Sequence, residues 1–364
     1  MRSYDHMLCR ALSRLDLDVE LVTTPIARTA APAPDGYGLT EPFTRRSGRL
    51  GPQYARVQRP LRAAEHLVDM GRHRLRPTPA DVRHYQWLPL EPADGLLLAR
   101  GAPRVFTMHN VLRRASRTAA LASARRLARR VDAVVVHTHE GARTLTELGG
   151  VPAERVHVIP HGPLDHLAEL PCETSLPEEL ARVQGPVILC FGMIRPYKGV
   201  DVLLEAFREI GGAELWIVGL PLRTPMAPLH EQARQASGRV RFVTRYVSDA
   251  ELAAYFRRAD LVVLPYREID QSGVLSCGLA FGKAMVASAV GGFTEVAEEH
   301  GAARLVPPGD PRALAAALSE LLADPGARHR LEAAATAAAR GPYSWAAIAD
   351  QTADLYRQLI AKER

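Results

Sequence analysis

Two cations stand on a glycine-bounded loop in a chain with very few lysines. Residues 191–199 read FGMIRPYKG and follow the apolar run VILC, so Arg195 and Lys198 come directly after a predicted strand. Only three lysines, Lys198, Lys283 and Lys362, occur among 46 basic residues, which argues against Lys198 as surface filler. A helix predicted over DVLLEAF adds its positive N-terminal dipole. We interpret the loop as a diphosphate site; a loop whose cations only solubilise the protein is the alternative.

A second loop of the same kind follows the predicted strand DLVVLPY. Gln271, Ser272 and Gly273 stand where this loop enters the next helix. Glycine lets the backbone approach a ligand closely, and we expect the amides of Gly273 and Val274 to face an anion there. A simple N-cap by Ser272 is the alternative.

A carboxylate occurs at a third position of this type. The segment VGGFTEVAEE follows the predicted strand AMVAS and carries Glu295. This side chain suits the orientation of a sugar hydroxyl or of a neighbouring cation. Alternatively, it only complements the dipole of its helix.

Histidines follow two predicted strands in the first half of the chain. RVFTMHN ends near His109, and DAVVVHTH ends near His137 and His139. We expect His109 to contact a substrate hydroxyl or the reacting centre, and we interpret the other two as structural. No carboxylate or cysteine keeps a ligand spacing with them, so the sequence does not favour a metal site.

The elements that must position these residues alternate between short apolar strands and helices. This alternation predicts an α/β protein with parallel sheets in two doubly wound domains. We expect an N-terminal domain over 1–165, a C-terminal domain over 166–342 and a final helix over 343–364, with 163–184 as the linker. The chain opens almost on a helix, so the strand expected to open the first domain is missing.

Bulk composition fits a globular protein of two domains. The chain has 364 residues, 47% hydrophobic and 24% charged, and no run approaches the roughly 18 apolar residues of a membrane span. Residues 1–20 mix charges and lack a signal core, so we expect a cytoplasmic protein. The four cysteines are widely separated, and we expect buried thiols rather than zinc ligands or a redox pair.

The positive charge is concentrated in the first half of the chain. Residues 1–165 contain 25 arginines, no lysine and 16 acidic residues, a net charge of +9, whereas residues 166–364 carry −3. A solvated arginine-rich face is the simplest interpretation. Peripheral contact with the inner membrane surface, or an anionic acceptor, is the alternative, and the absence of interleaved aromatics argues against nucleic acid.

Several of these stretches together resemble glycosyltransferase family 4, a family of retaining enzymes with the GT-B fold. The stretches are GMIRPYKGVDVLLEAF, ELWIVG, VRFVTRYVSDAELAAYFRRADLVVLPYR, QSGVL, AFGKAMVASAVGG and the closing YSW helix. The likeness is dense over about 186–360 and looser over 80–165, where ADVRHYQWLP, FTMHN and VIPHG match.

The resemblance implies two Rossmann-like domains across a cleft and a C-terminal helix that crosses back to the first. A nucleotide-diphosphate sugar would bind the C-terminal domain without metal or other cofactor. Arg195 and Lys198 would neutralise the diphosphate as the bond breaks, and His109 would lie near the transferred sugar. The implied donor-binding residues are Gly192, Tyr246, Val247, Glu268, Gln271, Ser272, Gly273, Val274 and Glu295.

The chain departs from the family pattern at the donor loops. Two glutamates common near the donor would fall at Ile269 and Cys277; Glu268 is one position from the first, and nothing replaces the second. The arginine that often follows the strand glycine is Met193 here. We interpret the loop as a variant donor site with QSG in place of the paired glutamates.

The predicted function is transfer of a hexose-type sugar, with retention, from a nucleotide donor to a polysaccharide, glycolipid or secondary-metabolite hydroxyl. A sugar-nucleotide epimerase of the same fold and a non-catalytic donor-binding or partner subunit are the alternatives. A nicotinamide enzyme has the least support, because no GxGxxG follows an opening strand.

Overall fold

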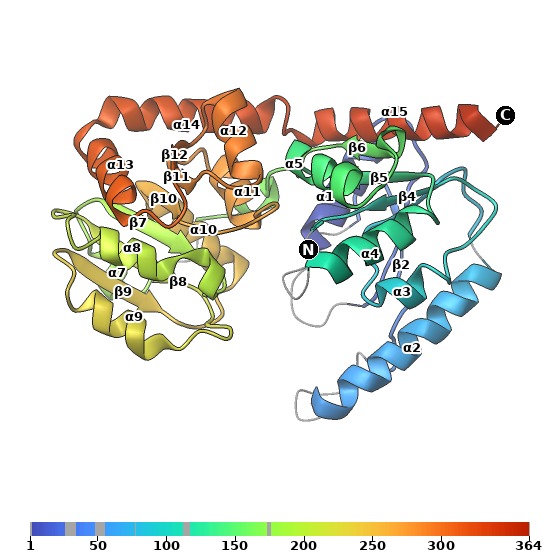
Figure 1. Ribbon diagram of the computed structural model, residues 1–364, viewed down its shortest axis with the longest axis horizontal. Helices are drawn as coiled ribbons and strands as arrows, with labels where there is room; N and C mark the ends of the chain where they lie inside the picture. Colours follow the sequence, from blue (N-terminus) through green and yellow to red (C-terminus); the bar gives the residue numbers. More distant parts are fainter. Residues whose placement is uncertain are drawn as a thin grey trace. The chain divides into compact units, whose positions relative to one another are not determined.

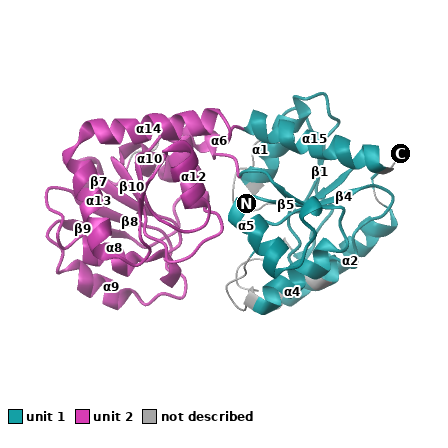
Figure 2. Cartoon of the chain, turned by 45° about the horizontal axis from the view of Figure 1, so that its top comes forward, with its two compact units in different colours: residues 1–160, 345–364 teal, residues 161–344 magenta. Residues whose placement is uncertain are grey.

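The chain folds into two compact units. A computed structural model describes residues 2–25, 34–47, 55–76, 78–111, 117–172 and 176–363. Unit 1 comprises residues 1–160 and 345–364, and unit 2 comprises residues 161–344 (Figure 2). The last helix, α15 (Trp345–Glu363), packs against α1 (Arg2–Ser13) within unit 1. The prediction that the C-terminal helix returns to the N-terminal domain is therefore confirmed.

Unit 2 is built on a six-stranded parallel sheet. The strand order is β12-β11-β10-β7-β8-β9. The chain moves outward from β7 through β8 to β9, and then starts again at β10 on the other side of β7, so the strand order reverses between β7 and β10. In doubly wound sheets ligands bind outside the carboxyl ends of the strands at such a reversal. The strands are β7 (Val187–Phe191), β8 (Glu214–Val218), β9 (Arg239–Val243), β10 (Leu261–Leu264), β11 (Met285–Ser288) and β12 (Arg304–Val306).

Helices cover both faces of this sheet (Figure 1). Strand β7 is buried on both sides: Ile188 and Cys190 belong to one core cluster, and Leu189 and Phe191 to the other. The first cluster is shared with α8 (Val200–Ala206), α9 (Met226–Ala233) and α13 (Pro311–Ala323), and the second with α10 (Asp249–Arg258), α11 (Gly273–Ala280), α12 (Gly292–His300) and α14 (Pro325–Arg340). Two apolar faces explain why these strands read as continuous apolar runs.

One prediction about a segment of unit 2 is wrong. Residues 163–184 are not a linker: they belong to unit 2, where Leu167 of α6 (Asp165–Ala168) and Leu180 of α7 (Glu178–Ala181) are buried in the core. The helical segment after β12 consists of two helices, because Asp324 ends α13 and its side chain accepts a hydrogen bond from the Ala327 amide at the start of α14.

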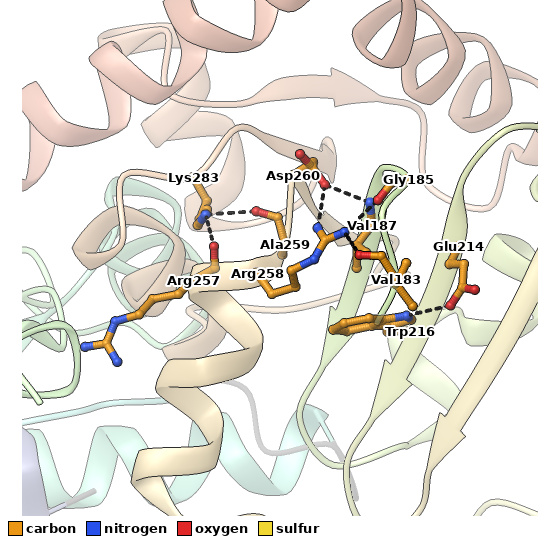
Figure 3. Close-up of polar contacts among 10 residues, drawn as sticks. All are labelled: Val183, Gly185, Val187, Glu214, Trp216, Arg257, Arg258, Ala259, Asp260 and Lys283. Carbon is orange, nitrogen blue, oxygen red and sulfur yellow. Dashed lines mark hydrogen bonds and ion pairs between the residues drawn. The ribbon is translucent and has the colours of Figure 1, made fainter. Parts of the chain in front are cut away.

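Lys283 has a structural role at the amino ends of β7 and β10 (Figure 3). Its Nζ donates to the carbonyl oxygens of Arg257 at 3.2 Å and Ala259 at 2.8 Å, where α10 ends. A cation there stabilises carbonyls that have no partner within the helix. Nearby, the Asp260 carboxylate accepts from the amide of Val187 at 2.8 Å, which ties the start of β7 to the residue before β10.

Unit 1 contains two parallel sheets. Four strands pair in the order β3-β4-β5-β6, and two others pair as β1-β2. Helices α1 and α15 pack on one face of the larger sheet, while α2 and α4 pack on the other. The strands are β1 (Glu20–Val22), β2 (Gly38–Thr40), β3 (Arg83–Tyr85), β4 (Arg104–Thr107), β5 (Ala133–Val136) and β6 (Val156–Val158); the helices include α2 (Ala55–Leu75), α3 (Glu91–Asp94), α4 (Arg117–Ala128) and α5 (His139–Arg143).

The prediction of four buried thiols needs one correction. Cys9, Cys190 and Cys277 are buried, but Cys172 is exposed. Burial raises the pKa of Cys190 to about 11 and that of Cys277 to about 12, so both stay protonated at neutral pH and pack as small apolar groups. Within the described ranges, no helix has the length and apolarity to cross a bilayer.

Candidate active site

The loop 191–199 lies where the strand order reverses. It leaves the carboxyl end of β7 through Gly192, whose φ is 98°, and enters α8 through Gly199, whose φ is 64°. A Cβ at Gly192 would lie 2.7 Å from Nζ of Lys198, and a Cβ at Gly199 would lie 2.0 Å from the carbonyl oxygen of Pro265. Only glycine fits both positions, because each combines a positive φ with a close contact.

Lys198 is buried beside the end of β10. The residue is only 6% exposed. Its Nζ donates to the carbonyl oxygen of Phe191 at 3.2 Å and lies 4.8 Å from the centre of the Tyr266 ring. Neither of these two partners carries a formal negative charge. The carbonyl and the aromatic face thus fix the position of this amine at the carboxyl end of β7.

Arg195 carries a second cation on the same loop. Its Nη2 lies 3.8 Å from the sulfur of Met193. Its Nε is buried and has no hydrogen-bond partner among the described residues. Buried polar atoms without a partner are rare in folded proteins and point to a missing ligand or water.

A salt bridge anchors this loop from the far side of the strand reversal. Arg267, which follows β10, donates from Nη1 to the Asp201 carboxylate at 2.9 Å and from Nη2 at 2.6 Å. The same residue donates to the carbonyl oxygens of Pro196 at 3.0 Å and Tyr197 at 2.7 Å. The hydrogen bonds from Arg267 lower the pKa of Asp201. Arg267 therefore fixes the backbone that carries Lys198.

The start of α11 faces Gly192. Cγ2 of Val274 would be 3.2 Å from a Cβ at that glycine. The Ser272 hydroxyl accepts from the Val274 amide at 3.2 Å, so the simple N-cap is present and the Val274 amide is already engaged. Gly273 has no atom within 4 Å of where its Cβ would stand, and the Oε1 of Gln271 is buried without a hydrogen-bond partner in the described part of the chain.

The remaining predicted donor residues lie farther along the same sheet edge. Glu268 is exposed on the loop after β10, and Glu295 lies in the first turn of α12. Burial, and after it the charge of Glu295, raise the pKa of Tyr343. Tyr246, 64% exposed, and Val247, packed against the core, follow β9, which β8 separates from β7.

His109 lies in unit 1, inside a chain of buried polar contacts. Its Nδ1 is 2.9 Å from Nε2 of His137, its Nε2 is 3.2 Å from Oε1 of Gln86, and its ring stacks on Trp87 with 3.9 Å between centroids. Nδ1 of His137 is 2.9 Å from the Ile159 carbonyl oxygen, which only accepts, so this nitrogen carries a proton.

Burial lowers the pKa of His137 to about 4, so the ring is neutral at pH 7. Its Nε2 is then an acceptor, and Nδ1 of His109 donates to it. His137 thus fits the predicted structural role, whereas His139 is exposed at the start of α5. Among the described residues, no group of three histidine, cysteine or acidic side chains is placed to hold a metal ion.

Comparison with known sequences agrees with this arrangement. The sequence profile of the family described as "Glycosyltransferase Family 4" matches residues 3–163, and the profile described as "Glycosyl transferases group 1" matches residues 185–324. The chain belongs to glycosyltransferase family 4. The two matched segments nearly coincide with unit 1 before α15 and with most of unit 2.

The names of the curated relatives of this family-4 chain state different acceptors. It is 35% identical over 244 residues to a D-inositol 3-phosphate glycosyltransferase of Xylanimonas cellulosilytica, a match that covers 62% of this chain and 57% of the relative. It is 37% identical over 116 residues to a GDP-mannose:glycolipid 4-beta-D-mannosyltransferase of Xanthomonas campestris, covering 31% and 33%. The chain thus spans between a third and three-fifths of these relatives.

Solved structures confirm the GT-B fold predicted for this family-4 chain. A sucrose-phosphate synthase of Thermosynechococcus elongatus superimposes with a TM-score of 0.72 at 22% identity, covering 99% of this chain and 93% of that one. HepE of Anabaena in complex with UDP-glucose superimposes with a TM-score of 0.71 at 20% identity, covering 98% and 96%.

Sequence reasoning on this family-4 chain missed two residues that contact the loop 191–199. Tyr266 and Arg267 contact the 191–199 loop directly, although the sequence separates them widely from it. The sequence PYR that follows DLVVL is the only local signal, and it gains meaning once β10 is known to pair with β7.

Proposed function

We propose that the chain is a retaining glycosyltransferase that moves a sugar from a nucleotide-diphosphate sugar to an acceptor hydroxyl. The observation that carries this proposal is the placement of Lys198 and Arg195 at the strand-order reversal between β7 and β10. Retention is expected because the family resembled by the sequence is a retaining one.

The proposed chemistry is electrostatic. As the glycosidic bond breaks, negative charge grows on the departing nucleoside diphosphate. The ammonium of Lys198 and the guanidinium of Arg195 stabilise that charge, and both are held by the fold before the donor arrives. We propose that these two cations replace a metal ion at the diphosphate and that no other cofactor takes part.

The rest of the donor site follows the sequence prediction. We assign the sugar and phosphates to Gly192, Gln271, Ser272, Gly273 and Val274, whose open glycine and unpartnered amide oxygen support the assignment. We keep Glu268 and Glu295 as partners of sugar or ribose hydroxyls, and Tyr246 with Val247 as neighbours of the nucleoside.

The names of similar proteins support the substrate class. Structures of HepE contain UDP in one case and UDP-glucose in another, which supports a nucleotide-sugar donor. The inositol-phosphate and glycolipid enzymes differ in their named acceptors, so the acceptor is proposed only as a hydroxyl of a polysaccharide, glycolipid or secondary metabolite. We propose that His109 lies beside the transferred sugar.

We further place the reaction at the cytoplasmic side, where the charge of +9 on residues 1–165 suits an anionic acceptor or membrane surface. Cosedimentation with anionic and neutral vesicles distinguishes a membrane contact from a soluble acceptor. Loss of binding above physiological salt would mark the contact as electrostatic.

The experiment that tests the proposal replaces Lys198 by methionine, which keeps the apolar stem and removes the charge. With a panel of nucleotide sugars, transfer or donor hydrolysis should fall by about 100- to 1,000-fold, as when one preorganised donor is lost at a reacting oxyanion. Lys362→Met, at an exposed position of α15, is the matched control. Unchanged turnover in Lys198→Met would contradict the assignment, and an epimerised donor without transfer would indicate the epimerase.

A further inference from the structure

A chain of hydrogen bonds in unit 1 orients the side chain of His109. Nδ1 of His137 lies 2.9 Å from the carbonyl oxygen of Ile159, and Nε2 of His137 lies 2.9 Å from Nδ1 of His109. The two histidines meet because they follow the neighbouring strands β4 and β5. Both are buried, His109 at 4% exposure and His137 at 7%. Water therefore does not compete for these contacts.

The direction of the chain is set at its Ile159 end. A carbonyl oxygen only accepts, so the proton of a neutral His137 lies on Nδ1. Burial lowers the pKa of His137 to about 4, so the ring is neutral at pH 7 and its Nε2 offers a lone pair. Nδ1 of His109 donates to that lone pair. A neutral His109 then has no proton left for its own Nε2.

Aromatic contacts hold the His109 ring in this orientation. The Trp87 ring stacks on it with 3.9 Å between centroids and 2° between planes, and Nε1 of Trp87 donates to the Asp5 carboxylate at 3.1 and 3.2 Å. Tyr4 meets the same ring edge-on at 4.9 Å. A turn of the imidazole by 180° would keep the stack but lose the hydrogen bond to His137. The stack thus fixes the plane of the ring, and His137 fixes which nitrogen points to which side.

The other nitrogen of His109 lies beside a carboxamide and a cavity. Its Nε2 is 3.2 Å from Oε1 of Gln86. A nitrogen without a proton requires a donor, and the Gln86 carboxamide supplies one when it turns about its last side-chain bond and presents its NH2 group. Gln86 and His109 line a cavity of about 1100 Å³ in unit 1, which strands β1 and β3 also line. A hydroxyl group bound in this cavity can supply the same donor.

We propose that His137 is a positioning residue: it fixes the proton of His109 on Nδ1, so that Nε2 of His109 accepts a hydrogen bond from a substrate hydroxyl. This inference rests on the proposed function, which places His109 beside the transferred sugar. An ionised phosphate oxygen only accepts, so it does not suit this nitrogen. His109 would therefore select a sugar hydroxyl that keeps its proton, whereas Arg195 and Lys198 in unit 2 provide donors for phosphate oxygens.

The protonation of His109 tests the proposal without any substrate. The full chain is labelled with ¹⁵N at histidine, and long-range ¹H–¹⁵N spectra are recorded at pH 7.5. The resonances of His109 are identified by their loss in His109→Phe. We expect a protonated Nδ1 and an unprotonated Nε2. A proton on Nε2, alone or together with one on Nδ1, would overturn the proposal.

Variants of His137 separate positioning from a purely structural role. His137→Phe keeps the ring but removes the acceptor, so His109 should no longer be held with its proton on Nδ1. Transfer should then fall by about 10- to 100-fold, as when the partner that orients a metal-bound histidine is removed. His137→Gln, whose Oε1 can accept from Nδ1 of His109, should restore both the tautomer and most of the transfer.

His84→Phe is the matched control. It removes another histidine of unit 1 whose pKa is lowered by burial, and it should leave the tautomer of His109 and the transfer rate unchanged. An unchanged tautomer in His137→Phe, or an equal change in His84→Phe, would overturn the role of His137. If the tautomers respond as expected while even the unsubstituted chain transfers no sugar, the positioning by His137 is supported and the proposed function is contradicted.

Discussion

The ammonium of Lys198 lies 4.8 Å from the centre of the Tyr266 ring. The two residues follow different strands, and they meet because β7 and β10 are neighbours in the sheet. Together with the Phe191 carbonyl, the ring holds the cation at the place where a doubly wound sheet binds its ligand.

Two substitutions of Tyr266 distinguish the contribution of its ring to nucleotide binding from that of its hydroxyl. Tyr266→Phe should leave nucleotide affinity nearly unchanged, because the aromatic face remains. Tyr266→Leu should weaken binding, since a desolvated cation–π contact contributes up to about 2 kcal/mol. Isothermal calorimetry with a nucleoside diphosphate measures both, and equal affinities for the two variants would argue against a role of the ring.

Removing Arg267 should affect donor binding more than stability. The Asp201–Arg267 pair is 44% and 43% exposed, so its loss should cost at most about 1 kcal/mol of folding free energy. Arg267→Ala also frees the carbonyl of Pro196 from its side-chain hydrogen bond, while the backbone hydrogen bond to Tyr197 remains, so we expect a higher KM for the donor. Arg304→Ala, which breaks an exposed pair with Glu320, is the control and should leave KM unchanged.

Two N-cap serines allow the effect of a helix cap at the candidate site to be compared with that of a cap outside it. Ser272 caps α11 and Ser248 caps α10. Alanine at either position should lower the free energy of unfolding by about 1 kcal/mol. Only Ser272→Ala should weaken nucleotide binding, because only α11 faces Gly192. A similar loss of affinity in Ser248→Ala would show that the effect is general destabilisation.

Position 199 should require glycine for two reasons, its positive φ and the close approach of the Pro265 carbonyl oxygen. Gly199 and Gly212 have φ values of 64° and 74°, but only at Gly199 would a Cβ meet an atom, at 2.0 Å from the Pro265 oxygen. Gly212→Ala should cost about 1–2 kcal/mol for the left-handed conformation alone. Gly199→Ala should cost more, and urea unfolding compares the two. Equal losses would mean that the loop relaxes freely.

Two histidines with lowered pKa values, the buried His137 and the partly buried His84, should make the protein less stable in mild acid. Burial lowers the pKa of His84 to about 3 and that of His137 to about 4, below the value of about 6.5 in an unfolded chain. Above pH 6.5 both states are neutral at these groups. As the pH falls below 6.5 the unfolded state takes up protons first, so stability is lost progressively down to the folded-state pKa values.

Each of these histidines contributes up to about 1.4 kcal/mol per pH unit in that window. Chemical denaturation at pH 7.5 and 5 measures the loss. His137→Asn, which retains a donor toward Ile159 but does not titrate there, should remove part of the difference. An unchanged pH dependence in that variant would contradict the role of His137.

The sequence by itself determined which elements form and where the loops with the candidate site residues begin. Strands such as VILCF and LVVL are short and apolar on both faces, and this pattern is enough to predict parallel strands with helices on both sides. The scarcity of lysine and the glycines around Lys198 identified the loop after β7. The sequence did not predict α2, whose segment is rich in arginine and has Pro60 inside the helix.

Only the tertiary structure decided which strands are neighbours. Periodicity reports the local environment of a residue, whereas pairing depends on packing between segments far apart in the chain. The pairing of β7 with β10 brings Tyr266 and Arg267 to Lys198, and the ends of α10 give Lys283 a structural role. The same dependence on distant partners leaves β1 and β3 on opposite sides of one cavity.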